Sequence, residues 1–361
     1  MRKITRKIYI GNVEVGGGAP ISVQSMTKTR TEDVKSTLKQ IFDLKKVGCD
    51  IVRVAVPNEK SATSLKEIVK KSPIPVVADI HFNPKLALMS LEAGVSSLRL
   101  NPGNIEDKKK IQEIVKRAKE LKIPIRIGVN SGSLPKEILK KYGGPTPEAL
   151  VESTLNHIKI LEDMDFFDIK VSLKASDIRT TVEAYRIFSK EKEYPLHLGI
   201  TEAGSFFSGT VKSSIGIGIL LYEGIGDTIR VSLTDSPLKE VKVGIEILKA
   251  LNLRGGEPEV ISCPTCGRNT TDLNLIVKDV EKFLKKKKIS LKVAIMGCEV
   301  NGPGEARLAD IGIAFSKSFA LIFKKGNIFL KIKKEKAVEI FKEEILKYWK
   351  EEGASQNERH Q

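Results

Sequence analysis

The sequence predicts an α/β protein in which a (β/α)8 barrel of the TIM type is followed by a small α+β domain. Eight strand patterns recur between residues 20 and 237, and segments with helical periodicity separate them. The repeating part also has the length of about 250 residues that is typical of one barrel. A stretch with Gly and Pro at residues 253–259 then predicts a boundary between residues 1–253, the barrel, and residues 254–361, the second domain.

The predicted barrel strands are short apolar runs that alternate with amphipathic segments. Between the fourth and fifth runs, Ile111, Ile114, Val115 and Ala118 follow the spacing of one helix face. This alternation favours a parallel sheet, and eight units favour closure into a barrel. In chain order, strands are expected at Ile21–Met26, Asp50–Val56, Ile74–His81, Ser96–Asn101, Ile123–Asn130, Phe167–Lys174, Tyr194–Thr201 and Thr228–Thr234.

One set of alternate positions in these strands is apolar, as expected for a face packed on outer helices, whereas the other set is polar. Because a barrel lumen is normally filled with branched apolar side chains, the polar set predicts a binding site inside the barrel. Any single Arg could instead be paired internally or lie outside. Six cations against one clear acid, Asp79, are costly unless an anion balances them, which predicts a phosphate-bearing ligand. The polar positions are Gln24, Arg53, Asp79, His81, Arg99, Asn101, Arg126, Asn130, Lys170, Lys174, His197, Arg230 and Ser232.

Residues after Pro237 predict a final barrel helix and then a small α+β module. The helix is expected at Leu238–Leu253, and a hairpin is expected to turn at Lys325–Asn327. The remaining expected elements are strands Glu259–Ser262, Leu291–Ile295 and Ile311–Phe315 and helices Thr271–Lys287 and Glu335–Lys350.

The formal charge of +16 is compatible with a nucleic-acid surface, but other features disfavour that class. Aromatic residues make up 6%, no binding module is recognisable, and most lysines fit a solvated surface. The best apolar run, Ile215–Tyr222, is far shorter than the roughly 20 residues of a membrane span, and the N-terminus lacks a signal core. We therefore expect a cytoplasmic protein that binds neither nucleic acid nor membranes.

Three of the four cysteines predict a metal centre in the second domain. Cys263 and Cys266 form a Cys-x2-Cys hairpin and Cys298 follows in a Gly-rich loop, whereas Cys49 is expected in the barrel core. The hairpin alone resembles a zinc knuckle, but a structural zinc site usually needs a fourth Cys or His nearby. Three thiolates with an incomplete shell fit a 4Fe–4S cluster better. A non-redox barrel enzyme with a zinc knuckle, acting on a phosphorylated or pterin-like substrate, remains the alternative.

Six motifs in order along the chain resemble a known family. They are SLRLNPGN, RIGVNSGSL, VSLKASD, LHLGITEAG, CPTCGR and MGCEVNGPGEARLADIGIAF. Together they resemble the 4-hydroxy-3-methylbut-2-enyl diphosphate synthase (IspG/GcpE) family in its short, two-domain bacterial form. The resemblance implies an oxidoreductase of non-mevalonate isoprenoid biosynthesis. Such an enzyme opens the ring of 2-C-methyl-D-erythritol 2,4-cyclodiphosphate, uses two electrons and releases water.

The resemblance also implies partners and roles for individual residues. Electrons would come from reduced flavodoxin or ferredoxin, and a head-to-tail homodimer would complete the site between subunits. The 4Fe–4S cluster would be held by Cys263, Cys266, Cys298 and Glu305. Glu202 would be the acid/base and Asn130 would lie beside the reacting carbons. Substrate binding is assigned to Arg53, Arg99, Arg126, Lys174 and Ser232, with Asp79, His81 and His197 as further candidates.

Overall fold

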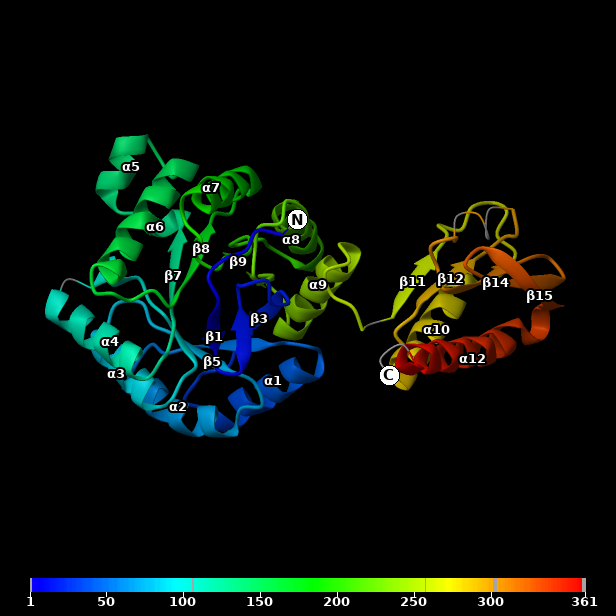
Figure 1. Ribbon diagram of the computed structural model, residues 1–361, viewed down its shortest axis with the longest axis horizontal. Coiled ribbons are helices and arrows are strands. Elements are labelled where there is room, and N and C mark those ends of the chain that lie inside the picture. Colours follow the sequence, from blue (N-terminus) through cyan, green and yellow to red (C-terminus); the bar gives the residue numbers. More distant parts are fainter. Residues whose placement is uncertain (1, 106, 257, 301–303, 305, 359–361) are drawn as a thin grey trace. The chain divides into compact units, whose positions relative to one another are not determined.

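The structure is a computed structural model that describes residues 2–105, 107–256, 258–300, 304 and 306–358 (Figure 1). The described chain forms two compact units, which divide between Leu253 and Arg254. The first unit is built on an eight-stranded sheet and the second on a five-stranded sheet. Each unit has its own hydrophobic core.

The sheet of the first unit forms the predicted (β/α)8 barrel, and all of its strand pairs are parallel. The strand order is β8-β7-β6-β5-β4-β3-β10-β9. A parallel bridge between Val171 in β8 and Leu196, just before β9, completes the circle. The strands are β3 (Ser22–Met26), β4 (Ile51–Ala55), β5 (Val76–Asp79), β6 (Ser97–Arg99), β7 (Ile125–Asn130), β8 (Ile169–Lys174), β9 (His197–Leu198) and β10 (Thr228–Ile229).

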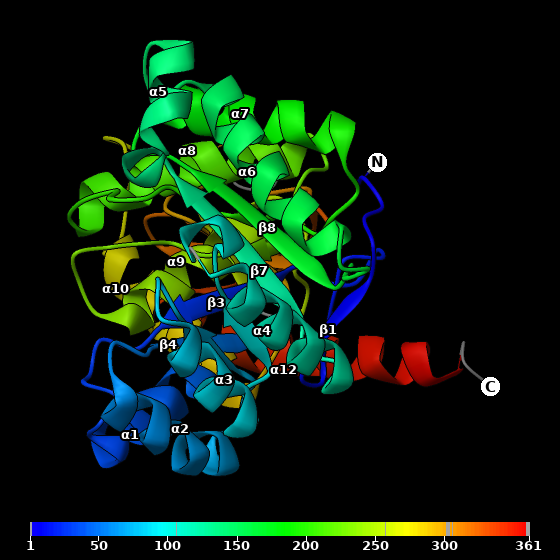
Figure 2. The same cartoon turned by 90° about the vertical axis from the view of Figure 1, so that its left-hand side faces the viewer.

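The barrel helices lie outside the strands, as Figure 2 shows for the helices around β7 and β8. Many of them begin at a side chain that accepts a backbone N–H of the first turn; Asp33, Asn58 and Asp177 are examples. Ser131–Ser133 and Pro102–Asn104 form short helical turns after β7 and β6. The helices are α1 (Val34–Lys46), α2 (Glu59–Lys71), α3 (Pro84–Glu92), α4 (Lys108–Glu120), α5 (Lys136–Tyr142), α6 (Pro147–Glu162), α7 (Ile178–Glu191), α8 (Phe206–Tyr222) and α9 (Pro237–Ala250).

The apolar positions of the strands pack against these helices, as their alternation predicts. Val52, Leu98, Ile125 and Val171 all belong to one buried cluster with helix residues, and none is more than 1% exposed. Cys49 lies in the same cluster and is fully buried, which confirms its predicted core position. The apolar packing between the strands and the outer helices therefore stabilises the barrel, because the polar interior contributes little hydrophobic burial.

An N-terminal hairpin, β1 (Ile8–Ile10) and β2 (Val13–Val15), packs on the barrel strands where β4 and β5 begin. Its apolar side chains form a cluster with Ile51 and Val77. These residues close the amino ends of the strands with apolar side chains. The carboxyl ends are the ends at which barrel enzymes carry their sites.

The second unit is a mixed sheet in the order β11-β12-β13-β14-β15, parallel from β11 to β13 and antiparallel from β13 to β15. Side chains of α10 and α12 share one core with β12 and β13. The last helix is longer than the predicted Glu335–Lys350. The elements are β11 (Glu259–Ser262), α10 (Leu273–Lys287), β12 (Lys292–Met296), β13 (Ile311–Phe315), β14 (Phe319–Lys324), β15 (Asn327–Lys333) and α12 (Ala337–Glu358).

Within the described chain, no helix is both long enough and apolar enough to cross a bilayer.

Candidate active site

Cationic side chains from several strands face a common interior in the barrel. The pKa of Arg126 in β7 is lowered by its own burial and then by Arg53 in β4, Arg99 in β6 and Arg230 after β10. Arg53 lies on β4 and Arg230 directly follows β10, and neither strand is a neighbour of β7 in the sheet. Side chains from these strands can act on Arg126 only across the lumen, so the polar positions point inward as their alternation predicts.

Asp79 at the end of β5 is the acid around which part of this set is arranged. Its carboxylate lies 3.9 Å from Arg53 Nη1 and 3.7 Å from Arg99 Nε, and its other oxygen lies 3.5 Å from His81 Nε2. His81 Nδ1 is also 3.2 Å from Arg99 Nη1. Burial alone would raise the pKa of Asp79, but Arg53, the His81 hydrogen bond and Arg99 outweigh it and lower that pKa. Asp79 therefore stays ionised and holds two guanidinium groups near the carboxyl ends of the strands.

One acid does not balance the remaining cations. Burial, reinforced by Arg126, lowers the pKa values of Lys170 and Lys174 well below the usual lysine value. Burial and then Lys174 likewise lower the pKa of His197, whose side chain is fully buried. The pKa of Arg230 falls to about 10, again mainly through burial. Each of these pKa shifts shows that a positive charge in this interior is unfavourable unless an anion binds nearby and compensates it.

Many buried polar atoms of the lumen have no hydrogen-bond partner within the described protein. Unsatisfied buried groups are rare in proteins and need an explanation. Most of them here are donors or carry positive charge, which is the arrangement that a bound anion would satisfy. They are both amide atoms of Gln24, Arg99 Nε, Arg126 Nε and Nη1, Lys170 Nζ, both ring nitrogens of His197 and Arg230 Nε, together with Asp79 Oδ1 and Ser172 Oγ.

The remaining predicted barrel residues lie at the end of a strand or in the loops that follow the strands. Asn130 ends β7 in register with Lys174 at the end of β8. Ser232 follows β10, and the next residue, Leu233, donates its N–H to Glu240 at 3.0 Å. Glu240 is buried at the start of α9 and also accepts the Ser25 hydroxyl at 3.1 Å, so it ties the Ser232 loop to β3.

Glu202 lies in the loop after β9 with an exposed side chain and a backbone φ of 52°. This left-handed conformation is uncommon for a residue other than glycine, and strained residues of this kind cluster at functional sites. The loop therefore holds the Glu202 backbone in a conformation that the residue would not adopt by preference.

The predicted thiols come from two loops that follow adjacent parallel strands of the second unit. Cys263 follows β11, and Cys298 lies two residues after β12. The N–H of Gly297 donates to Cys263 Sγ at 3.2 Å, so the two loops meet at this sulfur. A Cβ atom at Gly297 would lie 2.3 Å from Asn269 Oδ1, which only glycine avoids.

Thr270 fastens the Cys263–Cys266 loop onto the Gly297 loop. Its N–H donates to Gly297 O at 3.1 Å, and its hydroxyl lies 3.3 Å from Gly297 O and 3.1 Å from Ser316 O. Thr265, between the two thiols, has a φ of 55°, a strained value for a β-branched residue. The backbone of this hairpin is therefore organised around its sulfur atoms.

The donor chemistry of these loops fits an iron–sulfur cluster. Three thiols supply soft ligands, and a backbone N–H already bonds to one sulfur, an interaction that tunes such clusters. Within the described residues, no three His, Cys, Asp or Glu side chains are grouped to hold a single metal ion. Glu305, the predicted fourth ligand, lies outside the described residues.

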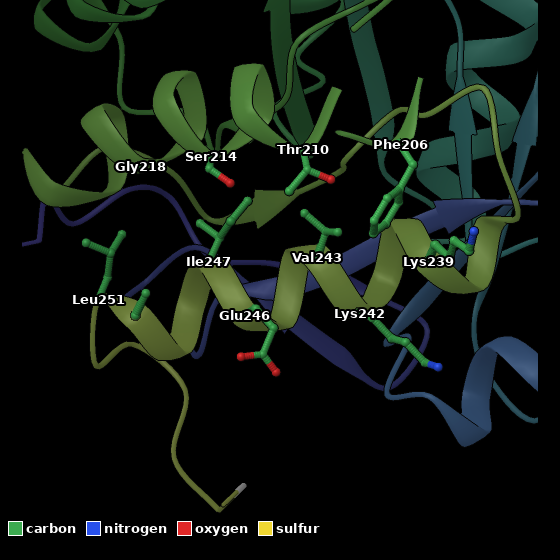
Figure 3. A pocket seen from close by; sticks show the side chains of 11 residues that line it. Phe206, Thr210, Ser214, Gly218, Lys239, Lys242, Val243, Glu246, Ile247 and Leu251 are labelled. Atoms are coloured by element: carbon green, nitrogen blue, oxygen red, sulfur yellow. The ribbon is translucent and has the colours of Figure 1, made fainter. Parts of the chain in front are cut away.

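An apolar groove lies on the outer surface of the barrel between α8 and α9 (Figure 3). Phe206 and Thr210 from α8 face Val243 and Ile247 from α9 across it. None of the predicted site residues lines this groove, and it offers few polar groups to orient a substrate. It is separate from the lumen.

Three residues of the predicted inward polar set have no specific predicted role, and His157, which supports the loop after β6, has no sequence signal. Lys170, Arg230 and Gln24 carried a signal, because they occupy the inward alternation of their strands. His157 in α6 carried none: its Nδ1 accepts the N–H of Gly103 at 2.9 Å and so holds the loop after β6. Burial, followed by Arg99, lowers the pKa of His157 to about 4, so it is neutral at physiological pH.

The fold and the lumen define a (β/α)8-barrel protein with a strongly cationic interior. Comparison with known protein families identifies its family: residues 5–245 match the GcpE TIM-barrel domain, and residues 259–347 match the GcpE protein C-terminal domain. The chain belongs to the GcpE family, which confirms the resemblance of its motifs.

Curated relatives cover nearly the whole chain. A protein of Lawsonia intracellularis is 57% identical over 96% of this chain and 97% of its own length, and one of Clostridium perfringens is 59% identical over 94% and 97%. Both are named 4-hydroxy-3-methylbut-2-en-1-yl diphosphate synthase (flavodoxin). Among solved structures, the Yersinia pestis dihydropteroate synthase has a TM-score of 0.50 at 11% identity over 68% of this chain and 97% of that chain. That similarity concerns the barrel fold alone.

Proposed function

We propose that this chain is a 4-hydroxy-3-methylbut-2-enyl diphosphate synthase of isoprenoid biosynthesis. In the proposed reaction, 2-C-methyl-D-erythritol 2,4-cyclodiphosphate takes up two electrons and two protons. One ring C–O bond to phosphate breaks, a hydroxyl leaves as water, and the linear allylic diphosphate is formed. The names of the relatives support the reaction. The observation that carries the proposal for this chain is the excess of buried, unpartnered cationic donors in the lumen.

The diphosphate is the group that the lumen fits. Arg53, Arg99 and Arg126 supply planar donor sets that match phosphate oxygens, and Lys174 adds a cation beside them. Ser232 adds a hydroxyl donor, while Asp79 and His81 hold Arg53 and Arg99 in place. We assign His197 to the floor of the site, because it is fully buried and its ring nitrogens are unpartnered. Binding the remote diphosphate would fix the carbon skeleton at the mouth of the barrel.

Glu202 and Asn130 are the residues that we assign to the reacting carbons. Glu202 would hold a proton at its carboxyl group for the departing hydroxyl, from a loop that leaves its side chain exposed after β9. Asn130, in register with Lys174, would orient the carbon chain by hydrogen bonding from its amide.

We further propose that Cys263, Cys266, Cys298 and Glu305 hold a 4Fe–4S cluster. When bound, the cluster would supply the electrons one at a time. The thiols of this chain hold the group, and the N–H of Gly297 is placed to bond to the Cys263 sulfur. We also place the protein in the cytoplasm, a reducing compartment in which thiols stay available as ligands.

Flavodoxin is the proposed electron donor, following the names of the relatives, with ferredoxin as the alternative. A net charge of +16 would attract such a carrier if it is acidic. We propose a homodimer as the active assembly. Apolar side chains at Phe207, Val211, Ile215 and Tyr222 of α8 are exposed, which supports self-association. Sedimentation should give twice the chain mass; a monomer with full activity contradicts the dimer.

The direct test is turnover by anaerobically purified protein supplied with the cyclic diphosphate, flavodoxin and a reductant. Formation of the linear allylic diphosphate is the expected result. Glu202→Gln should reduce turnover by about 100-fold or more, the usual contribution of a positioned acid, while iron content stays unchanged. The exposed Glu67→Gln, in α2, is the matched control and should turn over normally. Wild-type protein that contains iron but makes no product contradicts the proposed function.

A further inference from the structure

Gly128, in the middle of β7, touches the cationic set through its backbone. Its carbonyl oxygen accepts Arg99 Nη2 and Asn101 Nδ2, both at 2.9 Å, and its N–H donates to Asn101 Oδ1 at 2.8 Å. The Asn101 amide thereby continues the ladder between β6 and β7 after the regular strand pairing ends. One residue of β7 thus fixes the guanidinium group of a neighbouring strand.

The missing side chain of Gly128 leaves room for two guanidinium groups. A Cβ atom there would lie 3.0 Å from Arg126 Nη2, 3.1 Å from Arg99 Nε and 3.2 Å from Ser172 Oγ. Gly128 does not adopt a positive φ, so alanine suits its backbone. A methyl group there would therefore act by crowding the two guanidinium groups and the Ser172 hydroxyl.

These cations have little freedom to retreat. Arg99 is also held by His81 at 3.2 Å and by Asp79 at 3.7 Å, and Arg126 is only 4% exposed. Because like charges repel, the pair stays side by side only where the surrounding atoms fix both groups. A methyl group would move guanidinium nitrogens by a few tenths of an ångström relative to the anion that they bind.

The same arrangement recurs on the other side of the lumen. A Cβ atom at Gly199, directly after β9, would lie 2.7 Å from Lys174 Nζ. It would also lie 2.5 Å from the backbone oxygen of Arg230, so a substitution there would disturb the fold itself. Gly128 is the position where the effect on the cations can be isolated.

We propose that Gly128 is a positioning residue for anion binding, which sets the distance between the Arg99 and Arg126 guanidinium groups by having no side chain. The inference rests on the proposed function in that the cyclic diphosphate is taken as the natural ligand. Inorganic pyrophosphate serves as a second probe that does not depend on the reaction.

The test compares the affinities of both probes for wild type, Gly128→Ala and Gly244→Ala by calorimetry. Gly244→Ala is the matched control, because its Cβ would be similarly crowded, 3.2 Å from Val23, on the apolar outer side of the barrel. Gly128→Ala should bind both probes about tenfold more weakly, whereas Gly244→Ala should bind within about twofold of wild type. In turnover, Gly128→Ala should raise KM far more than it lowers kcat.

A rescue variant separates positioning from general damage. Ser172→Ala removes the one crowding atom that does not belong to a guanidinium group and gives the methyl group of Gly128→Ala room on that side, so the double variant should recover part of the lost affinity. Asn101→Ala, which adds no volume, should weaken binding in the same direction because it frees the Gly128 segment. Equal affinities in Gly128→Ala and Gly244→Ala, or no recovery in the double variant, overturns the inference. Pyrophosphate binding that depends on Gly128, without any binding of the cyclic diphosphate, would overturn the proposed substrate and leave this inference standing.

Discussion

The lumen of the barrel and the thiol loops of the second unit are two candidate sites built in opposite ways. In the lumen, the groups are buried, charged and carried by strands, and Arg99 has contacts to Gly128, His81 and Asp79. In the second unit, Cys266 is exposed, Cys263 is half-buried, and both lie on a loop. The charged groups of the lumen are held in place without a ligand, whereas the thiol loops are organised mainly around a single sulfur.

The difference shows how each site obtains its affinity. The barrel accepts the cost of burying like charges when it folds, so a matching anion meets donors that are already oriented. The thiol loops keep Cys266 accessible, and the binding of the proposed cluster would supply much of their final order. Substitutions in the barrel should therefore change affinity, whereas substitutions in the loops should decide whether the group is present at all.

The largest expected effect comes from removing one thiol. Cys298→Ser should abolish turnover and reduce iron well below the about four atoms per chain of an intact cluster. Pyrophosphate binding should stay unchanged, because the lumen is built by the first unit alone. Iron analysis and calorimetry on the same preparation measure both effects.

Cys49→Ser is the thiol control for this experiment, since Cys49 lies in the barrel core and its sulfur contacts Ile51 O at 3.1 Å. It should keep its iron. If Cys298→Ser also loses pyrophosphate binding, the two sites are not independent. About one zinc per chain in wild type would support the zinc alternative.

Removing one lumen cation should lower the affinity for the cyclic diphosphate and raise the stability of the ligand-free protein. Arg126→Met deletes a buried guanidinium with two unpartnered nitrogens, so affinity for the cyclic diphosphate should fall by about 2 kcal/mol or more, roughly 30-fold. The ligand-free protein should melt at a higher temperature than wild type, because an uncompensated buried charge is removed.

The control is Arg117→Met, on the outside of α4, where Arg117 pairs with Glu92 and Glu120. It should leave affinity and melting temperature nearly unchanged, as is usual for exposed ion pairs. A lower melting temperature for Arg126→Met would mean that its charge is compensated within the protein.

The lysines of the lumen give this site a pH dependence with a definite sign. Burial and neighbouring cations lower the pKa values of Lys170 and Lys174 in the folded protein. At any pH between the folded-state and unfolded-state pKa values, the unfolded chain therefore binds more protons than the folded chain. The free energy of unfolding of the ligand-free barrel should therefore gain from these groups as pH rises from neutral toward about 10, the usual lysine value. A bound diphosphate favours the protonated amines, so its binding takes up protons and weakens as pH rises.

Calorimetry of cyclic diphosphate binding in two buffers with different ionisation enthalpies measures the proton uptake. Lys174→Met should reduce it, and each proton taken up corresponds to a loss of about tenfold in affinity per pH unit. Proton release on binding, or affinity independent of pH between 7 and about 9.5, contradicts the assigned charge states.

The smallest expected effect concerns the fastening of the thiol loop. Thr270→Val removes the hydroxyl that contacts Gly297 O and Ser316 O, at a cost of about 1 kcal/mol in the stability of the second unit. Iron should be lost to a chelator faster than in wild type. Thr270→Ser keeps the hydroxyl and should retain iron like wild type; equal chelation rates for Val and Ser would exclude this role of Thr270.

The sequence alone predicts the lumen well, because strand geometry has an exact period of two. Arg53, Arg99 and Arg126 fall on the inward positions by counting alone. The expected strands Tyr194–Thr201 and Thr228–Thr234 extend beyond β9 and β10, because apolar residues continue after the chain leaves the regular ladder near Gly199 and Arg230. Periodicity reports which face a residue takes, but it does not report where hydrogen bonding between strands stops.

Contacts between distant residues have no comparable signal. The role proposed for Gly128 depends on atoms from β6, β7 and β8 that lie close together only in the folded protein. In the sequence alone, a glycine inside a strand indicates only a position that weakens the strand. The tie between Glu240 and the Ser232 loop, and that between His157 and Gly103, likewise require the fold. The assignment of Glu305 as a ligand rests on family resemblance alone, because nothing in the residue pattern distinguishes it from other carboxylates nearby in the sequence.

The central claim is that the barrel lumen holds the diphosphate, and a crystal structure with the cyclic diphosphate tests it most directly. We expect phosphate oxygens within hydrogen-bond distance of Arg53 and Arg126, inside the barrel. Ligand density outside the lumen, for example in the groove between α8 and α9, with the lumen side chains unchanged, would contradict the claim.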